Sequence, residues 1–204
     1  MKIQLAIDRV SIEKALEISQ KVNPYVDIIE VGTSLIKDFG VVSIEKIKSA
    51  FPGKSVLADI KTIDEGAYEF NSAFNSGADI ATVMGASAID TLRACYEVTQ
   101  RLNKIMMIDL LEVSFNKINT LKEFSNAVFC VHLPSDGGEK SLIAILEDFK
   151  LRFPEIKNIA VAGGVNLKSI TAIKKLGVDI VIIGGAITKA ENIEDAARRF
   201  RELI

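Results

Sequence analysis

Ionisable side chains stand at the carboxyl ends of several short apolar segments of the chain. They are Asp8, Glu30, Asp59, Lys61, Asp109 and His132, the last being the only histidine. Any one of the carboxylates could merely cap a helix, but acids, a lysine and a histidine gathered in one cavity would need mutual compensation of charge. A divalent cation shared by two carboxylates would provide it, and oxygen ligands without a cysteine pair favour Mg²⁺ over Zn²⁺. The set predicts a site that stabilises an oxyanion and moves a proton.

Two glycine pairs follow the last two apolar segments. Gly163 and Gly164 come after residues 159–162, and Gly184 and Gly185 come after residues 180–183. In barrel proteins the loops after the seventh and eighth strands often bind phosphate through backbone N–H groups. Two tight turns without a ligand are the alternative interpretation, but the position of the pairs favours a phosphate site.

The elements that would position these residues are short apolar segments that alternate with longer amphipathic ones. The apolar segments are four to six residues long and cover residues 3–7, 26–31, 55–60, 80–84, 105–110, 127–131, 159–162 and 180–183. Such segments are typical of parallel strands buried on both faces. Eight strands, each followed by a helix, predict a (β/α)8 TIM barrel of the phosphate-binding type, with an open doubly wound sheet as the main alternative.

The barrel prediction also separates acids at the starts of the strands from those at their carboxyl ends. Asp79 and Asp179 precede their apolar segments, at the opposite end from the candidate site, so we interpret both as structural. The length of 204 residues allows one sizeable domain, and we expect residues 1–204 to form a single barrel domain.

Composition limits the partners. Lys and Arg number 25 against 27 Asp and Glu, so a net charge of −2 gives no reason to expect nucleic-acid binding. No apolar segment approaches the roughly 18 residues of a membrane span, and the start of the chain does not resemble a signal peptide. Cys95 and Cys130 form no CxxC pair. We therefore expect a cytoplasmic protein with no membrane partner.

Four segments carry a resemblance to a known family. They are residues 27–33 (DIIEVGT), 58–66 (ADIKTIDEG), 160–164 (AVAGG) and 183–188 (IGGAIT). These motifs resemble those of the 3-hexulose-6-phosphate synthases, in the orotidine-monophosphate decarboxylase suprafamily, over almost the whole chain. The resemblance implies a homodimeric, phosphate-binding barrel in which Mg²⁺ helps to stabilise enediolates of sugar phosphates. The expected reaction joins formaldehyde to D-ribulose 5-phosphate.

The resemblance also implies roles for individual residues. Glu30 and Asp59 are similar to the metal ligands of the family. Lys61 is similar to the lysine that stabilises the enediolate charge, and Asp8 to the aspartate that orients this lysine and a substrate hydroxyl.

Three further residues match the family's pattern in the same way. Asp64 resembles an aspartate that enters the active site of the partner subunit. Asp109 is similar to an acid that binds substrate, and His132 to the histidine that transfers the proton.

Two other functions stay open at this point. A 3-keto-L-gulonate-6-phosphate decarboxylase would carry Glu at the position of Asp109 and Arg at the position of Ser135, so the synthase is favoured. Orotidine-monophosphate decarboxylases carry Lys at the position of Glu30. Residues 132–140 lack the family's Q-A-A-G segment, although Asp136 matches its aspartate, and this departure is the basis for a third possibility, a non-catalytic sugar-phosphate-binding barrel.

Overall fold

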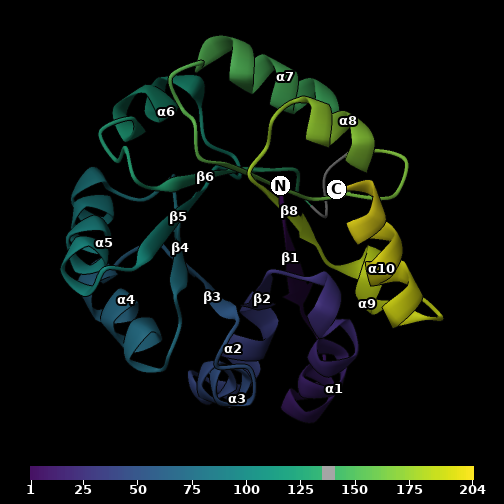
Figure 1. The fold of residues 1–204 in the computed structure, drawn as a ribbon. Helices are drawn as coiled ribbons and strands as arrows, with labels where there is room; N and C mark the ends of the chain where they lie inside the picture. The colour runs from purple at the N-terminus through teal and green to yellow at the C-terminus, as the bar shows by residue number, and fades with distance from the viewer. Residues whose placement is uncertain (135–140) are drawn as a thin grey trace.

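Eight parallel strands form one closed barrel in the computed structural model, which describes residues 1–134 and 141–204. The strands are β1 (Lys2–Ile7), β2 (Ile28–Val31), β3 (Ser55–Thr62), β4 (Ile80–Met84), β5 (Ile105–Asp109), β6 (Val128–His132), β7 (Ile159–Ala162) and β8 (Ile180–Ile183). Neighbours pair in chain order, and β1 also pairs with β8, which closes the barrel (Figure 1). The predicted (β/α)8 TIM barrel is therefore confirmed, and an open doubly wound sheet is excluded.

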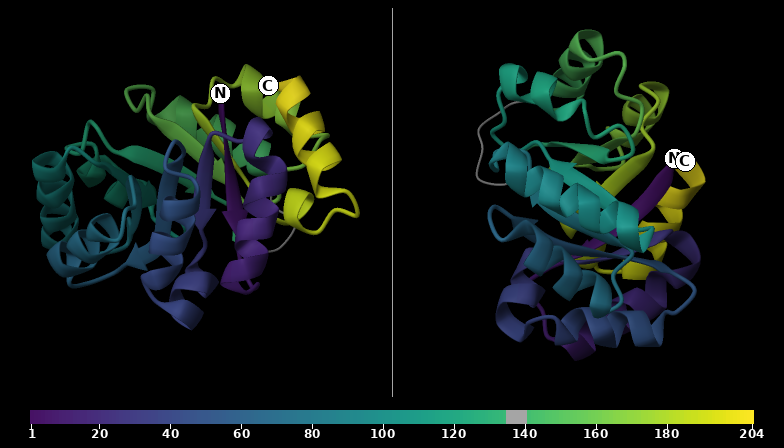
Figure 2. Two further views of the ribbon diagram at one scale, coloured as in Figure 1. Left: turned by 60° about the horizontal axis from the view of Figure 1, so that its bottom comes forward. Right: turned by 90° about the vertical axis from the view of Figure 1, so that its left-hand side faces the viewer.

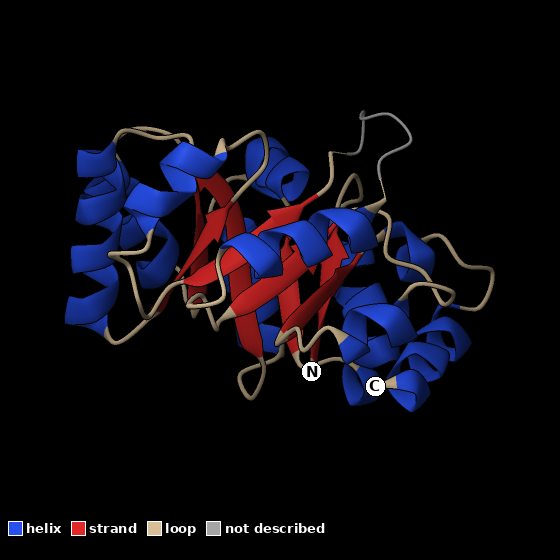
Figure 3. Cartoon of the chain, turned by 90° about the horizontal axis from the view of Figure 1, so that it is seen from above, coloured by secondary structure: helices blue, strands red, loops and turns tan. Residues whose placement is uncertain are grey.

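Helices surround the barrel and cover the outer face of the strands (Figures 2 and 3). They are α1 (Ile12–Val22), α2 (Thr33–Phe39), α3 (Val42–Ala50), α4 (Gly66–Asn75), α5 (Ile89–Leu102), α6 (Phe115–Leu121), α7 (Leu142–Arg152), α8 (Ile170–Lys175), α9 (Gly185–Thr188) and α10 (Ile193–Leu203), with a 3-10 turn at Asn23–Tyr25. Within the described ranges, no helix has both the length and the apolar character of a membrane span. Cys95 and Cys130 are free and buried.

The barrel interior has an apolar floor and a polar upper layer. Side chains two positions apart in a strand face the same side, and five consecutive strands use this spacing to place an apolar residue below a polar one. The pairs are Ile28 and Glu30, Leu57 and Asp59, Ile80 and Thr82, Met107 and Asp109, and Cys130 and His132. The polar member always lies nearer the carboxyl end of its strand, so the chemistry gathers at one mouth of the barrel.

Strand β3 departs from regular geometry where it carries the candidate residues. It extends to Thr62, and its register against β4 shifts between Ala58 and Thr62. Lys61 adopts a left-handed backbone conformation with φ 47°, which is uncommon for a residue with a side chain. The side chains of Asp59 and Lys61 lie on the same side, since Lys61 Nζ is 3.1 Å from Asp59 Oδ1. This placement does not come from the regular alternation of side chains along a strand, because the register shift and the left-handed Lys61 interrupt that alternation.

Asp79 and Asp179 close the opposite end of the barrel, as the sequence predicts. Asp79 Oδ2 accepts the backbone N–H of Val56 at 3.0 Å, and Asp179 Oδ2 accepts that of Ile159 at 2.9 Å. Each carboxylate thus ties the start of its own strand to the start of the preceding one, a structural role far from the mouth.

Candidate active site

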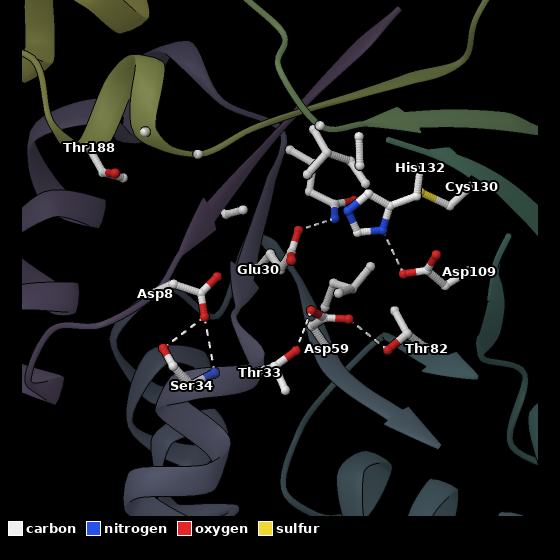
Figure 4. Close-up of a pocket in the computed structure, with 18 of the residues that line it drawn as sticks. Asp8, Glu30, Thr33, Ser34, Asp59, Thr82, Asp109, Cys130, His132 and Thr188 are labelled. Carbon is white, nitrogen blue, oxygen red and sulfur yellow. Dashed lines mark hydrogen bonds and ion pairs between the residues drawn. The ribbon is translucent and has the colours of Figure 1, made fainter. Parts of the chain in front are cut away.

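A cavity of about 880 Å³ opens among the carboxyl ends of the strands. Its lining contains every candidate residue from the sequence except Asp64: Asp8, Glu30, Asp59, Lys61, Asp109, His132, Gly163, Gly164, Gly184 and Gly185. Figure 4 shows the acids and the histidine directed into one space from separate strands. The side chains converge as the barrel topology predicts, because parallel strands present their carboxyl ends at the same mouth.

Lys61, Asp109 and His132 form one connected hydrogen-bonded chain across β3, β5 and β6. Lys61 Nζ donates to Asp109 Oδ2 at 2.8 Å, and His132 Nδ1 lies 2.8 Å from the same oxygen. Burial opposes ionisation of Asp109, but His132 and Lys61 outweigh it and lower the pKa of this carboxyl to about 2. Since an ionised carboxylate can only accept hydrogen bonds, His132 donates to Asp109 through Nδ1–H.

Asp59 accepts hydrogen bonds from two threonines as well as from Lys61. Thr33 Oγ1 donates to Asp59 Oδ2 at 2.6 Å, and Thr82 Oγ1 donates to Asp59 Oδ1 at 2.9 Å. The Thr82 hydroxyl in turn accepts the backbone N–H of Lys61 at 2.9 Å, which stabilises the left-handed residue. Burial disfavours the Lys61 ammonium, yet the carboxylates of Asp59 and Asp109 outweigh burial and raise its pKa above the usual range. Lys61 is therefore a fixed cation in the cavity.

Glu30 is the acid of the site whose pKa is shifted furthest. Its residue surface is only 6% exposed, and its hydrogen-bond donor in the described structure is Gln4, whose Nε2 lies 2.5 Å from Glu30 Oε2. Burial and the neighbouring Asp59 carboxylate together raise the pKa of Glu30 to about 8. Without a further cation, this carboxyl is therefore largely protonated at neutral pH.

Asp8 stands at the outer edge of the cavity, where α2 begins. Ser34 donates to Asp8 Oδ1 through both its backbone N–H, at 3.0 Å, and its hydroxyl, at 2.8 Å. A Cβ atom on Gly32 would lie 2.4 Å from the Asp8 carboxyl atoms, so this close approach requires glycine. Asp8 Oδ2 accepts no hydrogen bond from the described residues and is available to a ligand.

The two glycine pairs line the cavity from β7 and β8. Gly163 and Gly164 have φ values of 91° and 70°, and a Cβ on Gly163 would lie 2.1 Å from the carbonyl oxygen of Leu133. Gly184 precedes α9, which Gly185 opens. The first N–H groups of a helix have no partner within it, so this turn presents backbone donors beside the Gly163–Gly164 loop, an arrangement that suits an anion.

Asp64 does not join the cavity of its own chain. It lies exposed after β3, and its Oδ1 accepts the backbone N–H of the adjacent Glu65 at 2.9 Å. The role in a partner subunit that the resemblance implies stays a prediction. Ser135 and Asp136 lie outside the described residues, as does most of the segment that departs from the family pattern.

The acids fit a small divalent cation better than a metal with a full protein cage. Among residues 1–134 and 141–204, no three side chains of His, Cys, Asp or Glu are grouped as metal ligands. Glu30 and Asp59 offer two neighbouring carboxylates, and burial together with the Asp59 charge raises the pKa of Glu30. Mg²⁺ is commonly bound by one or two carboxylates together with water and substrate oxygens, so the donor set is suitable for it.

Several lining residues were not singled out from the sequence. Gln4 and Thr82 are polar residues inside apolar segments, and this interruption is the signal that could have found them. Ser34 gives a weaker signal, because a serine at the start of a helix is usually interpreted as a cap. Lys189 packs its side chain near Gly185 and adds a cation to the glycine end of the cavity.

Comparison with known proteins places these features in a family. A 3-hexulose-6-phosphate synthase from Mycobacterium gastri is 36% identical over 212 residues, which cover 100% of both chains. A crystal structure of a 3-hexulose-6-phosphate synthase superposes with a TM-score of 0.91 at 35% identity and full coverage of both chains. A 3-keto-L-gulonate-6-phosphate decarboxylase from Vibrio cholerae gives a TM-score of 0.87 at 26% identity, covering 99% of this chain and 96% of the other.

The family model described as orotidine 5'-phosphate decarboxylase / HUMPS matches residues 1–200. Together with the full-length relatives, this match confirms the resemblance found in the motifs. The chain therefore belongs to the orotidine 5'-phosphate decarboxylase / HUMPS family.

Proposed function

We propose that this chain is a Mg²⁺-dependent aldehyde-lyase of the 3-hexulose-6-phosphate synthase type, which joins formaldehyde to D-ribulose 5-phosphate through an enediolate. The observation that carries the proposal is the connected chain of Lys61, Asp109 and His132 beside the carboxylates of Glu30 and Asp59. The similarity to 3-hexulose-6-phosphate synthases over the full length supports the same reaction, and it is stronger than the similarity to the decarboxylase.

The reaction has simple requirements. A base removes a proton from C1 of ribulose 5-phosphate and leaves an enediolate with negative charge on oxygen. C1 then forms a bond to the carbon of formaldehyde, and the formaldehyde oxygen takes up a proton as its C=O double bond opens. No group leaves, so the site must supply one group that moves a proton and cations that stabilise the oxyanion.

His132 is suited to move the proton. Its Nε2 is the free basic nitrogen, because Nδ1 donates to the ionised Asp109. When Nε2 takes the C1 proton, the Asp109 carboxylate stabilises the resulting imidazolium, as an acid does in other catalytic acid–histidine pairs. The same histidine can then give a proton to the new hydroxyl group.

Lys61 is suited to stabilise the oxyanion. Its ammonium is held in the cavity by Asp59 and Asp109, so it needs no reorientation when negative charge develops. Glu30 and Asp59 would hold Mg²⁺, which supplies further positive charge beside the oxyanion when bound. Asp8 Oδ2 would accept a hydrogen bond from a substrate hydroxyl.

The glycine turns would bind the phosphate group. Backbone N–H groups around Gly164 and Gly185 suit phosphate oxygens, and Lys189 lies near Gly185. These turns follow β7 and β8, whereas Asp59 and Lys61 stand on β3, so the phosphate would lie across the cavity from these two residues.

We also infer that the protein acts as a homodimer with shared active sites. Asp64 is exposed and lies outside its own cavity, and Ile63 and Tyr68 beside it are 58% and 74% exposed. An apolar surface around an acid suits a contact that delivers this acid to a second copy of the chain. The cytoplasmic location stays a prediction.

The experiment uses the purified protein with two substrates. With Mg²⁺ present, we expect consumption of formaldehyde and ribulose 5-phosphate and little release of CO₂ from 3-keto-L-gulonate 6-phosphate. Decarboxylation as the faster reaction would overturn the synthase assignment. Binding of ribulose 5-phosphate without either reaction would favour the non-catalytic barrel.

A second comparison tests the metal. The Asp59→Asn variant and the wild type in excess chelator should both lose turnover, whereas Asp90→Asn, on the exposed start of α5, should keep it. Full activity of the wild type in chelator would show that no divalent cation takes part.

A further inference from the structure

Gln4 is a polar residue at a level of the barrel that is otherwise apolar. It stands in register with Ile28 on β2 and with Ile182 on β8, and it is completely buried. Its neighbours in β1, Ile3 and Leu5, face the helices, so Gln4 projects to the barrel interior and contributes to the lining of the cavity. A buried amide is costly unless its groups are hydrogen-bonded, so its presence here requires a reason.

Only one of the two polar atoms of this amide makes a hydrogen bond in the described structure. Nε2 donates to Glu30 Oε2 at 2.5 Å, whereas Oε1 is buried and meets no hydrogen-bond donor among the described residues. An apolar side chain of similar volume would avoid the unpaired oxygen and would match the apolar level. Packing alone therefore does not account for glutamine at this position, and the contact with Glu30 remains as the explanation.

Glu30 depends on this contact more than the other acids depend on any single donor. Asp59 is held by two threonine hydroxyls and by Lys61. Asp109 is held by Lys61, His132 and a backbone N–H. For Glu30, by contrast, Gln4 is the one donor that the described structure provides.

We infer that Gln4 is a positioning residue of the active site, which fixes the orientation of the Glu30 carboxylate and so sets the affinity of the site for a divalent cation. The inference rests on the proposed role of Glu30 as a metal ligand. Partners that orient metal ligands commonly contribute 10- to 100-fold to metal affinity. Gln4 is expected to act through Glu30 and not to touch the reacting atoms.

The test measures binding of Mn²⁺, a spectroscopic substitute for Mg²⁺, by electron paramagnetic resonance with and without ribulose 5-phosphate. The Gln4→Met variant keeps the length and volume of the side chain but removes the donor, and we expect Mn²⁺ affinity to fall by about 10- to 100-fold. Gln4→Leu serves as a second apolar variant. The matched control is Ser19→Ala, which removes a buried hydroxyl on α1 that likewise has no partner among the described residues, and it should bind Mn²⁺ like the wild type.

A double-mutant cycle separates a positioning role from a purely structural one. In a Glu30→Gln background, adding Gln4→Met should change Mn²⁺ affinity very little, because the ligand that Gln4 orients is already gone. At saturating Mg²⁺, Gln4→Met should leave the KM for ribulose 5-phosphate nearly unchanged.

The outcomes distinguish the two proposals. If the wild type binds no Mn²⁺ under either condition, the assignment of Glu30 and Asp59 as metal ligands fails. If the wild type binds Mn²⁺ and both folded Gln4 variants bind it equally well, the positioning role of Gln4 is wrong. An effect of Gln4→Met that persists in the Glu30→Gln background would also overturn it.

Discussion

Replacing Glu30 with glutamine should stabilise the metal-free protein against unfolding, by an amount that grows with pH. Burial and the Asp59 carboxylate raise the pKa of Glu30 from its ordinary value of 4.5 to about 8 in the folded protein. Since the folded state then binds the proton more tightly than the unfolded state, the wild type loses stability as the pH rises between these two values. Glutamine does not titrate, and its amide can turn to accept the hydrogen bond from Gln4.

The magnitude follows from the shift. One pKa unit corresponds to about 1.4 kcal/mol, so ionisation of Glu30 should cost about 5 kcal/mol once the pH exceeds 8. The corresponding cost is about 3 kcal/mol near pH 7 and under about 1 kcal/mol near pH 5. The advantage of Glu30→Gln over the wild type should therefore rise steadily across this range and level off above it.

The assay is urea unfolding of both proteins in chelator, at several pH values between about 5 and 9. The control is Glu97→Gln, which removes the same charge from an exposed position on α5 and should show no such rise. Addition of Mg²⁺ should stabilise the wild type but not Glu30→Gln, because a ligand stabilises only the state that binds it. A stability difference that does not change with pH would refute the reasoning.

Three further predictions concern the other charged residues. Mixed Lys61→Ala and Asp64→Ala chains should recover activity that neither variant has alone, because a hybrid dimer contains one intact site. If no activity returns despite proven subunit exchange, Asp64 does not act in the active site of the partner subunit. His132→Asn should bind ribulose 5-phosphate but slow exchange of the C1 proton into deuterated water by about 10²-fold or more, and wild-type-like exchange would exclude it as the base. Asp109→Asn should lower stability at neutral pH by about 2 kcal/mol, since the pKa of Asp109 falls to about 2 when folded. Because that stabilisation is lost as pH falls from about 4 to 2, unfolding curves of wild type and variant should converge there, and parallel curves would contradict this.

The fold was predictable because its signal is local. Strands buried on both faces are apolar throughout, and residues 80–84, 159–162 and 180–183 match β4, β7 and β8 to the residue. Boundaries moved where tertiary contacts extend or shorten a strand, as in β3, which runs on to Thr62 under the Thr82 hydrogen bond with Lys61. The pattern predicted one helix after each strand, whereas two, α2 and α3, follow β2; the seven residues of α2 are too few to show a helical period of their own.

The sequence predicted which residues form the candidate site better than it predicted the hydrogen bonds between them. Because a parallel barrel brings all carboxyl strand ends to one mouth, the position of an acid in the chain was enough to place Asp8, Glu30, Asp59 and Asp109 in one cavity. Gln4 was overlooked, since one polar residue in an apolar segment carries no periodic signal of its own.

The alternation of elements, the polar residue beyond the apolar one in β2 to β6, and the glycine pairs after β7 and β8 can all be read along the chain. These features depend on residues that are close together in the chain, such as the spacing of two that places two side chains on one face of a strand. Which atoms come into contact depends on the packing of distant segments. Lys61 and Asp109 are 48 positions apart in the chain, yet they lie 2.8 Å apart because the register of β3, β4 and β5 aligns them. The raised pKa of Glu30 and the lowered pKa of Asp109 likewise follow from charges that other strands bring close, in a buried space where such charges interact strongly.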